Sequence, residues 1–113
     1  MLHALKVVSA VLTVATGLLA AIRPSAVPGF TGLQIAGPRG VTEIRSIFGG
    51  LFIGVGAYPL VVGEPATYVM LGVMYLTIGA ARLMSMLIDG SLSETSNLVS
   101  LVVEIVLGTV LIL

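Results

Sequence analysis

The sequence has few of the residues that carry out chemistry or bind nucleic acid. It contains no cysteine, no tryptophan and one histidine, and only 9% of its residues are charged, five basic and five acidic. The absence of cysteine excludes disulfides, thiolate metal ligands and thiol catalysis. A net charge of zero provides no basic surface for nucleic acid. We therefore expect no catalytic residues, no metal, no cofactor and no nucleic-acid partner, and we interpret His3 as a solvated residue.

Apolar residues, in contrast, are abundant. The hydrophobic set makes up 58% of the 113 residues, and the mean hydropathy is +1.19. A soluble domain carries about 25% charged residues, whereas a membrane-spanning helix needs roughly 20 apolar ones. The apolar runs do not alternate as barrel strands do, and helices satisfy their own backbone groups in lipid. The sequence predicts a single domain, 1–113, that is an all-α, integral membrane, up-down four-helix transmembrane bundle, with helices at about 4–22, 44–62, 66–88 and 97–113 and a long loop at 23–42.

The first apolar segment and the loop after it each allow two interpretations. The segment is long for a signal peptide, and Arg23 and Pro24 stand where cleavage would be expected, so we expect a retained helix. The loop contains an apolar piece at 30–36 that we expect to lie on or dip into the membrane interface. Long loops in small proteins are often functional. The loop is therefore either a partner-facing surface or a simple connector.

The basic residues are distributed unevenly along the predicted helices. Arg23, Arg39, Arg45 and Arg82 fall on or near the side of the first and third loops, whereas Lys6 falls on the other side. Cytoplasmic loops of membrane proteins carry an excess of lysine and arginine. We therefore predict that the first and third loops are cytoplasmic and that both termini are periplasmic.

Three charged residues lie inside the apolar runs, where charge is costly and usually faces a partner or a water-filled cavity. At a rise of 1.5 Å per residue, Arg82 lies about 9 Å and Glu104 about 10 Å from the same side of the membrane. Arg45 lies nearer the surface on that side. We predict a buried ion cluster of Arg45, Glu104 and Arg82, with Glu43 balancing the second guanidinium. The cluster either fixes the packing or serves a proton or ligand.

Small residues recur at helical spacing on the first two predicted helices. Such stripes allow helices to approach closely in lipid, where no hydrophobic effect separates a helix from its surroundings. They serve either packing within the chain or contact with a partner or a second copy. The predicted packing residues are Ser9, Thr13, Gly17 and Ala21 on the first helix and Ser46, Gly50 and Gly54 on the second.

Several stretches resemble a known family of membrane proteins. Residues 43–50 (EIRSIFGG) resemble the second helix of the bacterial membrane family filed as domain of unknown function 4345. Residues 79–83 (GAARL), then Asp89-Gly90 and Glu104, resemble its later helices, although Ala81 stands where the family usually has glycine. The resemblance implies a compact four-helix protein of the bacterial cytoplasmic (inner) membrane, similar in layout to the DoxX-like group. Some members of that group accompany quinol-oxidising or other redox complexes.

Three functions are compatible with this sequence, and none of them requires a catalytic set. The first is a non-catalytic accessory or structural subunit that stabilises a larger membrane complex. The second is a small oligomeric transporter or proton-linked channel that uses Arg45, Arg82 and Glu104. The third is a quinone- or lipid-binding redox accessory with Tyr75 and Arg82 near the headgroup. In each case the expected partners are the lipid bilayer and other membrane-protein subunits or copies of the chain itself.

Overall fold

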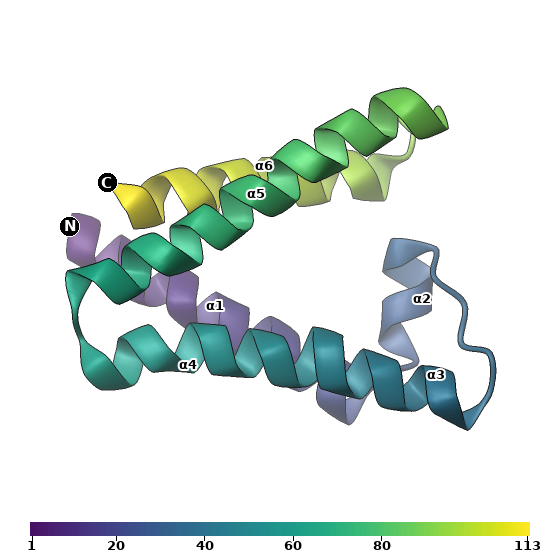
Figure 1. Cartoon of the computed structure of the whole chain (residues 1–113), viewed down its shortest axis with the longest axis horizontal. Helices are drawn as coiled ribbons and strands as arrows, with labels where there is room; N and C mark the ends of the chain where they lie inside the picture. The colour runs from purple at the N-terminus through teal and green to yellow at the C-terminus, as the bar shows by residue number, and fades with distance from the viewer. The chain divides into compact units, whose positions relative to one another are not determined.

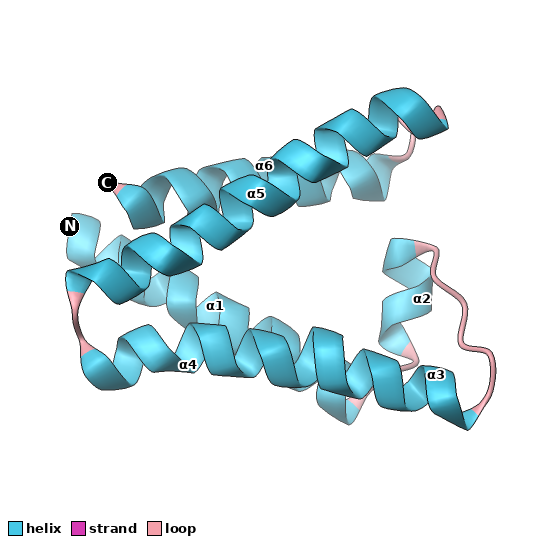
Figure 2. Ribbon diagram, in the orientation of Figure 1, coloured by secondary structure: helices cyan, strands magenta, loops and turns pink.

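The computed structural model describes residues 1–113 and confirms the predicted fold class, because every regular element is a helix. Four helical segments are long and apolar enough to cross a membrane. The chain is therefore a multi-pass helical membrane protein, with apolar helix surfaces suited to contact with lipid. Figure 2 shows helices joined by short loops. The elements are α1 (Leu2–Ile22), α2 (Ala26–Thr31), α3 (Pro38–Glu43), η1 (Ile44–Leu51), α4 (Phe52–Val62), α5 (Pro65–Asp89) and α6 (Thr95–Ile112).

The chain divides into two compact units. One unit combines residues 1–9 with residues 64–113, so it contains the first turns of α1 together with α5 and α6. The other unit comprises residues 10–63, which include the rest of α1, α2 and the helix from α3 to α4. Each unit has its own close helix packing.

The second spanning helix begins earlier than the sequence predicts. It runs from Pro38 to Val62 through α3, η1 and α4, rather than starting near residue 44. Proline suits the first turn because its missing N–H is not needed there, and Gly37 before it adopts a left-handed φ of 84°. The middle of the helix, η1, is π-helical. Two parts of the predicted loop 23–42 are therefore helical: residues 38–42 begin the long helix, and residues 26–31 form α2.

In the unit of residues 10–63, α1 lies along this long helix (Figure 1), and glycines form the contact between them. A Cβ added at Gly17 would lie 2.7 Å from the Gly49 carbonyl oxygen and 2.7 Å from the Ile53 nitrogen. A Cβ at Gly56 would lie 2.9 Å from the Ala10 carbonyl oxygen. The two backbones are so close that no side chain fits at these positions, as expected for helices that associate in lipid.

In the other unit, α5 and α6 form an antiparallel hairpin (Figure 1). Gly90 ends α5 with a left-handed φ of 69°, and its N–H bonds to the Met86 carbonyl. Glycine again permits the close approach, because a Cβ at Gly72 would lie 2.9 Å from the Gly108 carbonyl oxygen. The tight turn and the close contact fix the register of α5 against α6, and that register places the polar side chains described next.

Candidate functional site

The α5–α6 hairpin carries a partly buried ion pair between Arg82 and Glu104. Arg82 Nε lies 2.9 Å from each carboxylate oxygen of Glu104, and Arg82 Nη2 lies 2.7 Å from Glu104 Oε1. The Glu104 side chain is 8% exposed, and that of Arg82 is 30% exposed. The planar guanidinium can bind a carboxylate with two parallel donors and keeps its charge in a dry site. Two opposite charges are thereby held together inside a membrane-length hairpin.

Asn97 and Ser91 extend this pair toward the α5–α6 turn. Arg82 Nη1 donates to Asn97 Oδ1 at 3.1 Å. Asn97 Nδ2 in turn donates to Ser91 Oγ at 3.1 Å. The network thus runs from α5 through α6 into the turn between them. Asn97 lies two helical turns before Glu104 and therefore on the same face of α6, whereas no spacing rule points to Ser91.

A pocket of about 360 Å³ opens beside this network. Its lining combines the polar side chains of the network with apolar groups of α5, and Ser85 and Asp89 add further polar surface. Arg82 is the lining residue with the largest number of donors, since a guanidinium has five N–H groups. The pocket therefore presents a partly exposed cation, hydroxyls and one carboxylate. It could hold water or a small polar ligand.

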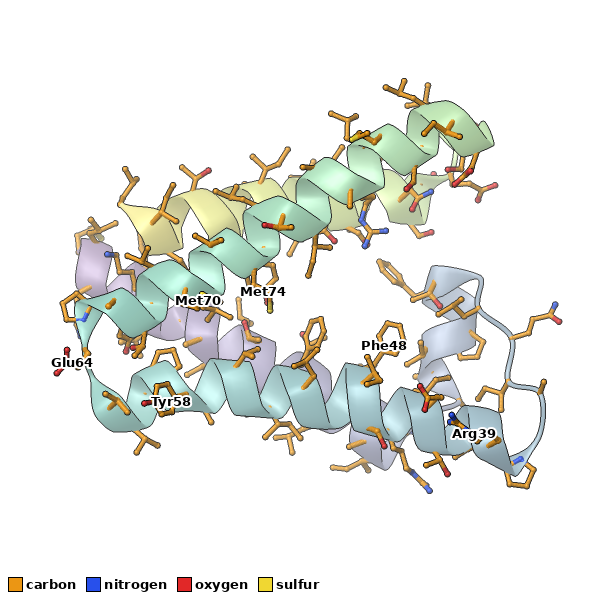
Figure 3. The ribbon with its side chains drawn as sticks, in the orientation of Figure 1. Arg39, Phe48, Tyr58, Glu64, Met70 and Met74 are labelled. Carbon is orange, nitrogen blue, oxygen red and sulfur yellow. The ribbon has the colours of Figure 1, made fainter.

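The other two residues predicted for the cluster lie in the unit of residues 10–63, where each has a partner. Arg45 on η1 is exposed, and its Nε donates to the Ala21 carbonyl oxygen at 3.1 Å. Glu43 pairs with Arg39 one turn earlier on the same helix. Figure 3 labels Arg39 on this helix. The Arg82–Glu104 pair is thus formed inside one unit, and the participation of Arg45 and Glu43 in the cluster stays a prediction.

The two predicted small-residue stripes lie in different surroundings. On α1, Ser9, Thr13 and Gly17 are buried, and Ser9 Oγ donates to the Leu5 carbonyl at 2.8 Å. Ala21 lies against the other helix, because a Cβ added at Gly49 would be 2.9 Å from the Ala21 Cβ. Thr13, Gly17 and Ala21 of this stripe therefore lie at the contact with the long helix.

On the long helix, Ser46, Gly50 and Gly54 are all exposed. A Cβ at Gly54 would meet no other atom within 4 Å, and at Gly50 the nearest atom is the Arg45 carbonyl oxygen at 4.0 Å. The glycines that contact α1 are instead Gly49 and Gly56. The helix therefore has a second small-residue face, defined by Ser46, Gly50 and Gly54, with no helix of its own unit packed on it.

A second pocket, of about 170 Å³, lies in the unit of residues 10–63. It is bordered by α1, α2, η1 and α4, and its walls include Phe30, Phe48 and Phe52. These are all the phenylalanines in the sequence. No sequence pattern predicts the pocket, because Phe30 is far along the chain from the other two and joins them only through the position of α2. Figure 3 labels Phe48 on the long helix.

The remaining titratable residues do not gather into a metal site. The ring of His3 contacts the ring of Tyr68 edge-on, with centroids 5.9 Å apart. The structure contains no group of three histidine, aspartate or glutamate side chains that could hold a metal ion. His3 itself is exposed. Its ring contact joins the first turn of α1 to α5 within one unit.

The family model described as "Domain of unknown function (DUF4345)" matches residues 1–113. No curated protein and no solved structure matches the chain. The match covers both units and all four spanning helices.

Proposed function

We propose that this chain, which belongs to the family described as Domain of unknown function (DUF4345), is a non-catalytic accessory subunit of a larger membrane complex. In this role its helices pack against those of other integral membrane proteins and stabilise the assembly. The observation that supports this role is the exposed face of Ser46, Gly50 and Gly54 on the long helix.

Exposed glycines inside a spanning helix are unfavourable unless something approaches them. A glycine in a helix interior is about 1 kcal/mol less favourable than alanine, and lipid tails fit well against larger apolar side chains. Small residues at this spacing let two helix backbones meet closely, and close contact drives helix association in lipid. Gly17 and Gly56 already have such a neighbour within the chain. Gly50 and Gly54 are available for a helix of another subunit.

The same role includes a location and an orientation. We place the protein in the bacterial cytoplasmic membrane with both termini periplasmic. The orientation is supported by Arg23, Arg39 and Arg45, which lie together near the loop between α1 and the long helix, whereas Lys6 lies near the opposite end of α1. Cytoplasmic loops carry the excess of basic residues.

The test is the mass and composition of the native particle after extraction in mild detergent. We expect a particle of defined composition that contains this chain together with different membrane proteins. Gly54→Leu should release the chain from it, because leucine fills the exposed face without meeting atoms of the chain itself. Ala15→Leu is the matched control, since Ala15 is also an exposed small residue of a spanning helix. A wild-type chain extracted only as a monomer would contradict the role, and a particle made only of copies of the chain would favour transport instead.

A small transporter or proton-linked channel is the second candidate, and the pocket beside Arg82 is the observation that favours it. A charged pair at this depth in a spanning hairpin often marks an ion or substrate pathway. Purified protein in vesicles would then move protons or a small polar solute, and replacement of both Arg82 and Glu104 by apolar residues would abolish the flux. For the accessory subunit, the same double replacement should leave assembly intact.

A further inference from the structure

The walls of the pocket in the unit of residues 10–63 are apolar throughout, although two threonines contribute to them. Thr16 Oγ1 donates to the Leu12 carbonyl at 2.8 Å, and Thr31 Oγ1 donates to the Val27 carbonyl at 2.8 Å. Both hydroxyls are therefore occupied by the backbone of their own helices. Almost no polar surface is exposed on the pocket wall, so the pocket suits a hydrocarbon group.

The size of the pocket suits a short length of alkyl chain. Its volume is about 170 Å³, and an apolar cavity of about 150 Å³ lined by similar side chains stays dry and binds benzene. Residues of α2, which follows shortly after the end of α1, form part of the pocket wall. The pocket therefore lies at the end of the spanning helix, where a chain of a lipid could enter from the bilayer.

Two arginines without an acidic partner in their own unit lie at the same end of these helices. Arg23 directly follows α1, and Arg45 lies about one turn before Phe48 on the long helix. The Arg45 Nε bond to the Ala21 carbonyl shows that the two helices meet at this level. Within the unit of residues 10–63 the ion pair joins Arg39 to Glu43, so neither Arg23 nor Arg45 has an acidic partner in this unit.

The segment between Arg23 and Arg39 is uncharged. From Pro24 to Pro38 no residue is acidic or basic, and Phe30 and Leu33 are exposed apolar residues. An apolar segment flanked by cations is suited to the boundary between acyl chains and headgroups, where basic residues attract anionic lipids. The positive charge of the arginines and the apolar surface beside them together indicate a ligand that is amphipathic and negatively charged.

We propose that this pocket is a binding site for an anionic phospholipid. One acyl chain enters between α1, α2 and the long helix and contacts Phe30, Phe48 and Phe52. The phosphate and headgroup lie at the level of Arg23 and Arg45, whose guanidinium groups supply the charge. This site is separate from the exposed Ser46, Gly50 and Gly54 face, and it does not depend on the accessory role.

The test is the lipid retained by the full-length protein when native mass spectrometry releases it from nanodiscs. The nanodiscs contain equal amounts of phosphatidylglycerol and phosphatidylcholine with the same acyl chains. Each arginine near the membrane surface contributes about fivefold in affinity for anionic lipid. We expect wild-type protein to retain phosphatidylglycerol over phosphatidylcholine by about thirtyfold when both arginines act. Arg23→Gln and Arg45→Gln should each lower this preference about fivefold, whereas Lys6→Gln should leave it unchanged.

Two further variants test the binding of the acyl chain separately from the binding of the headgroup. Ala26→Phe fills the pocket from α2 and should abolish retention of either lipid, whereas Ala36→Phe, at an exposed position outside the pocket, should not. Arg45→Lys keeps the charge but loses the Nε bond, so it should keep the preference for phosphatidylglycerol. This variant tests the role of the charge even where Arg45→Gln folds poorly. Helix content by circular dichroism reports the folding of each variant. Equal retention of the two lipids by wild-type protein would overturn the proposal. If Lys6→Gln lowered the preference for phosphatidylglycerol as much as the arginine variants do, the proposal would also be overturned. Retention of lipid by Ala26→Phe would overturn it as well.

Discussion

Replacement of one partner of the Arg82–Glu104 pair should be far more harmful than replacement of both. Glu104→Leu leaves the Arg82 guanidinium without the carboxylate that receives its Nε and Nη2 bonds. Breaking a buried ion pair from one side costs about 3–5 kcal/mol, and arginine at the centre of a spanning helix costs about 2.5–3.5 kcal/mol on insertion scales. Because Arg82 is 30% exposed, we expect the lower end, a loss of about 3 kcal/mol in the free energy of unfolding.

The double variant Arg82→Met/Glu104→Leu removes both charges and fills similar volume. Replacement of a buried ion pair by apolar residues is often neutral or stabilising, so we expect this protein to unfold within about 1 kcal/mol of wild type. The assay is equilibrium unfolding in mixed detergent micelles, followed by circular dichroism, for wild type, both single variants and the double variant. If Glu104→Leu alone were as stable as wild type, or the two single losses simply added in the double variant, the ion pair would not stabilise the hairpin as we describe.

Three other predictions follow from contacts within the units. Gly17→Leu should destabilise the chain by about 3 kcal/mol or more, because its side chain would overlap the backbone at Gly49; thermal unfolding in detergent checks this. Asn97→Ala should cost about 1.5 kcal/mol, because it removes one hydrogen bond to a charged group, and the same unfolding assay measures it. Gly54→Leu should leave the unfolding free energy of the isolated chain unchanged or raise it by up to about 1 kcal/mol, since the position is open and leucine favours helix.

The sequence predicted the spanning helices and the partnership of Arg82 with Glu104 from simple physical quantities. Apolar runs of membrane length can only be helices in this context, and four such helices are present. The rise per residue places Arg82 and Glu104 at one depth, and a short polar turn brings their helices together. Depth and connectivity were sufficient here because α5 and α6 are neighbours in sequence and in space.

Other features depended on local geometry that composition does not encode. The long helix contains two small-residue faces, and spacing alone could not decide that Gly49 and Gly56, rather than Gly50 and Gly54, contact α1. The π-helical segment from Ile44 to Leu51 adds to this difficulty, because its turns are wider than those of an α-helix and shift the phase of the faces. The pocket around Phe48 depends on the position of α2, which lies in a segment expected to be a loop.

The most direct test of the accessory role is photo-crosslinking at the exposed small-residue face in intact cells. A photoreactive amino acid replaces Ser46 in one variant and Ala15, an exposed residue of α1, in another. We expect irradiation of the Ser46 variant to give an adduct with a different membrane protein, identified by mass spectrometry, which the Ala15 variant does not form. Adducts with lipid alone, or the same products from both positions, would contradict the proposal that this face packs against a partner subunit.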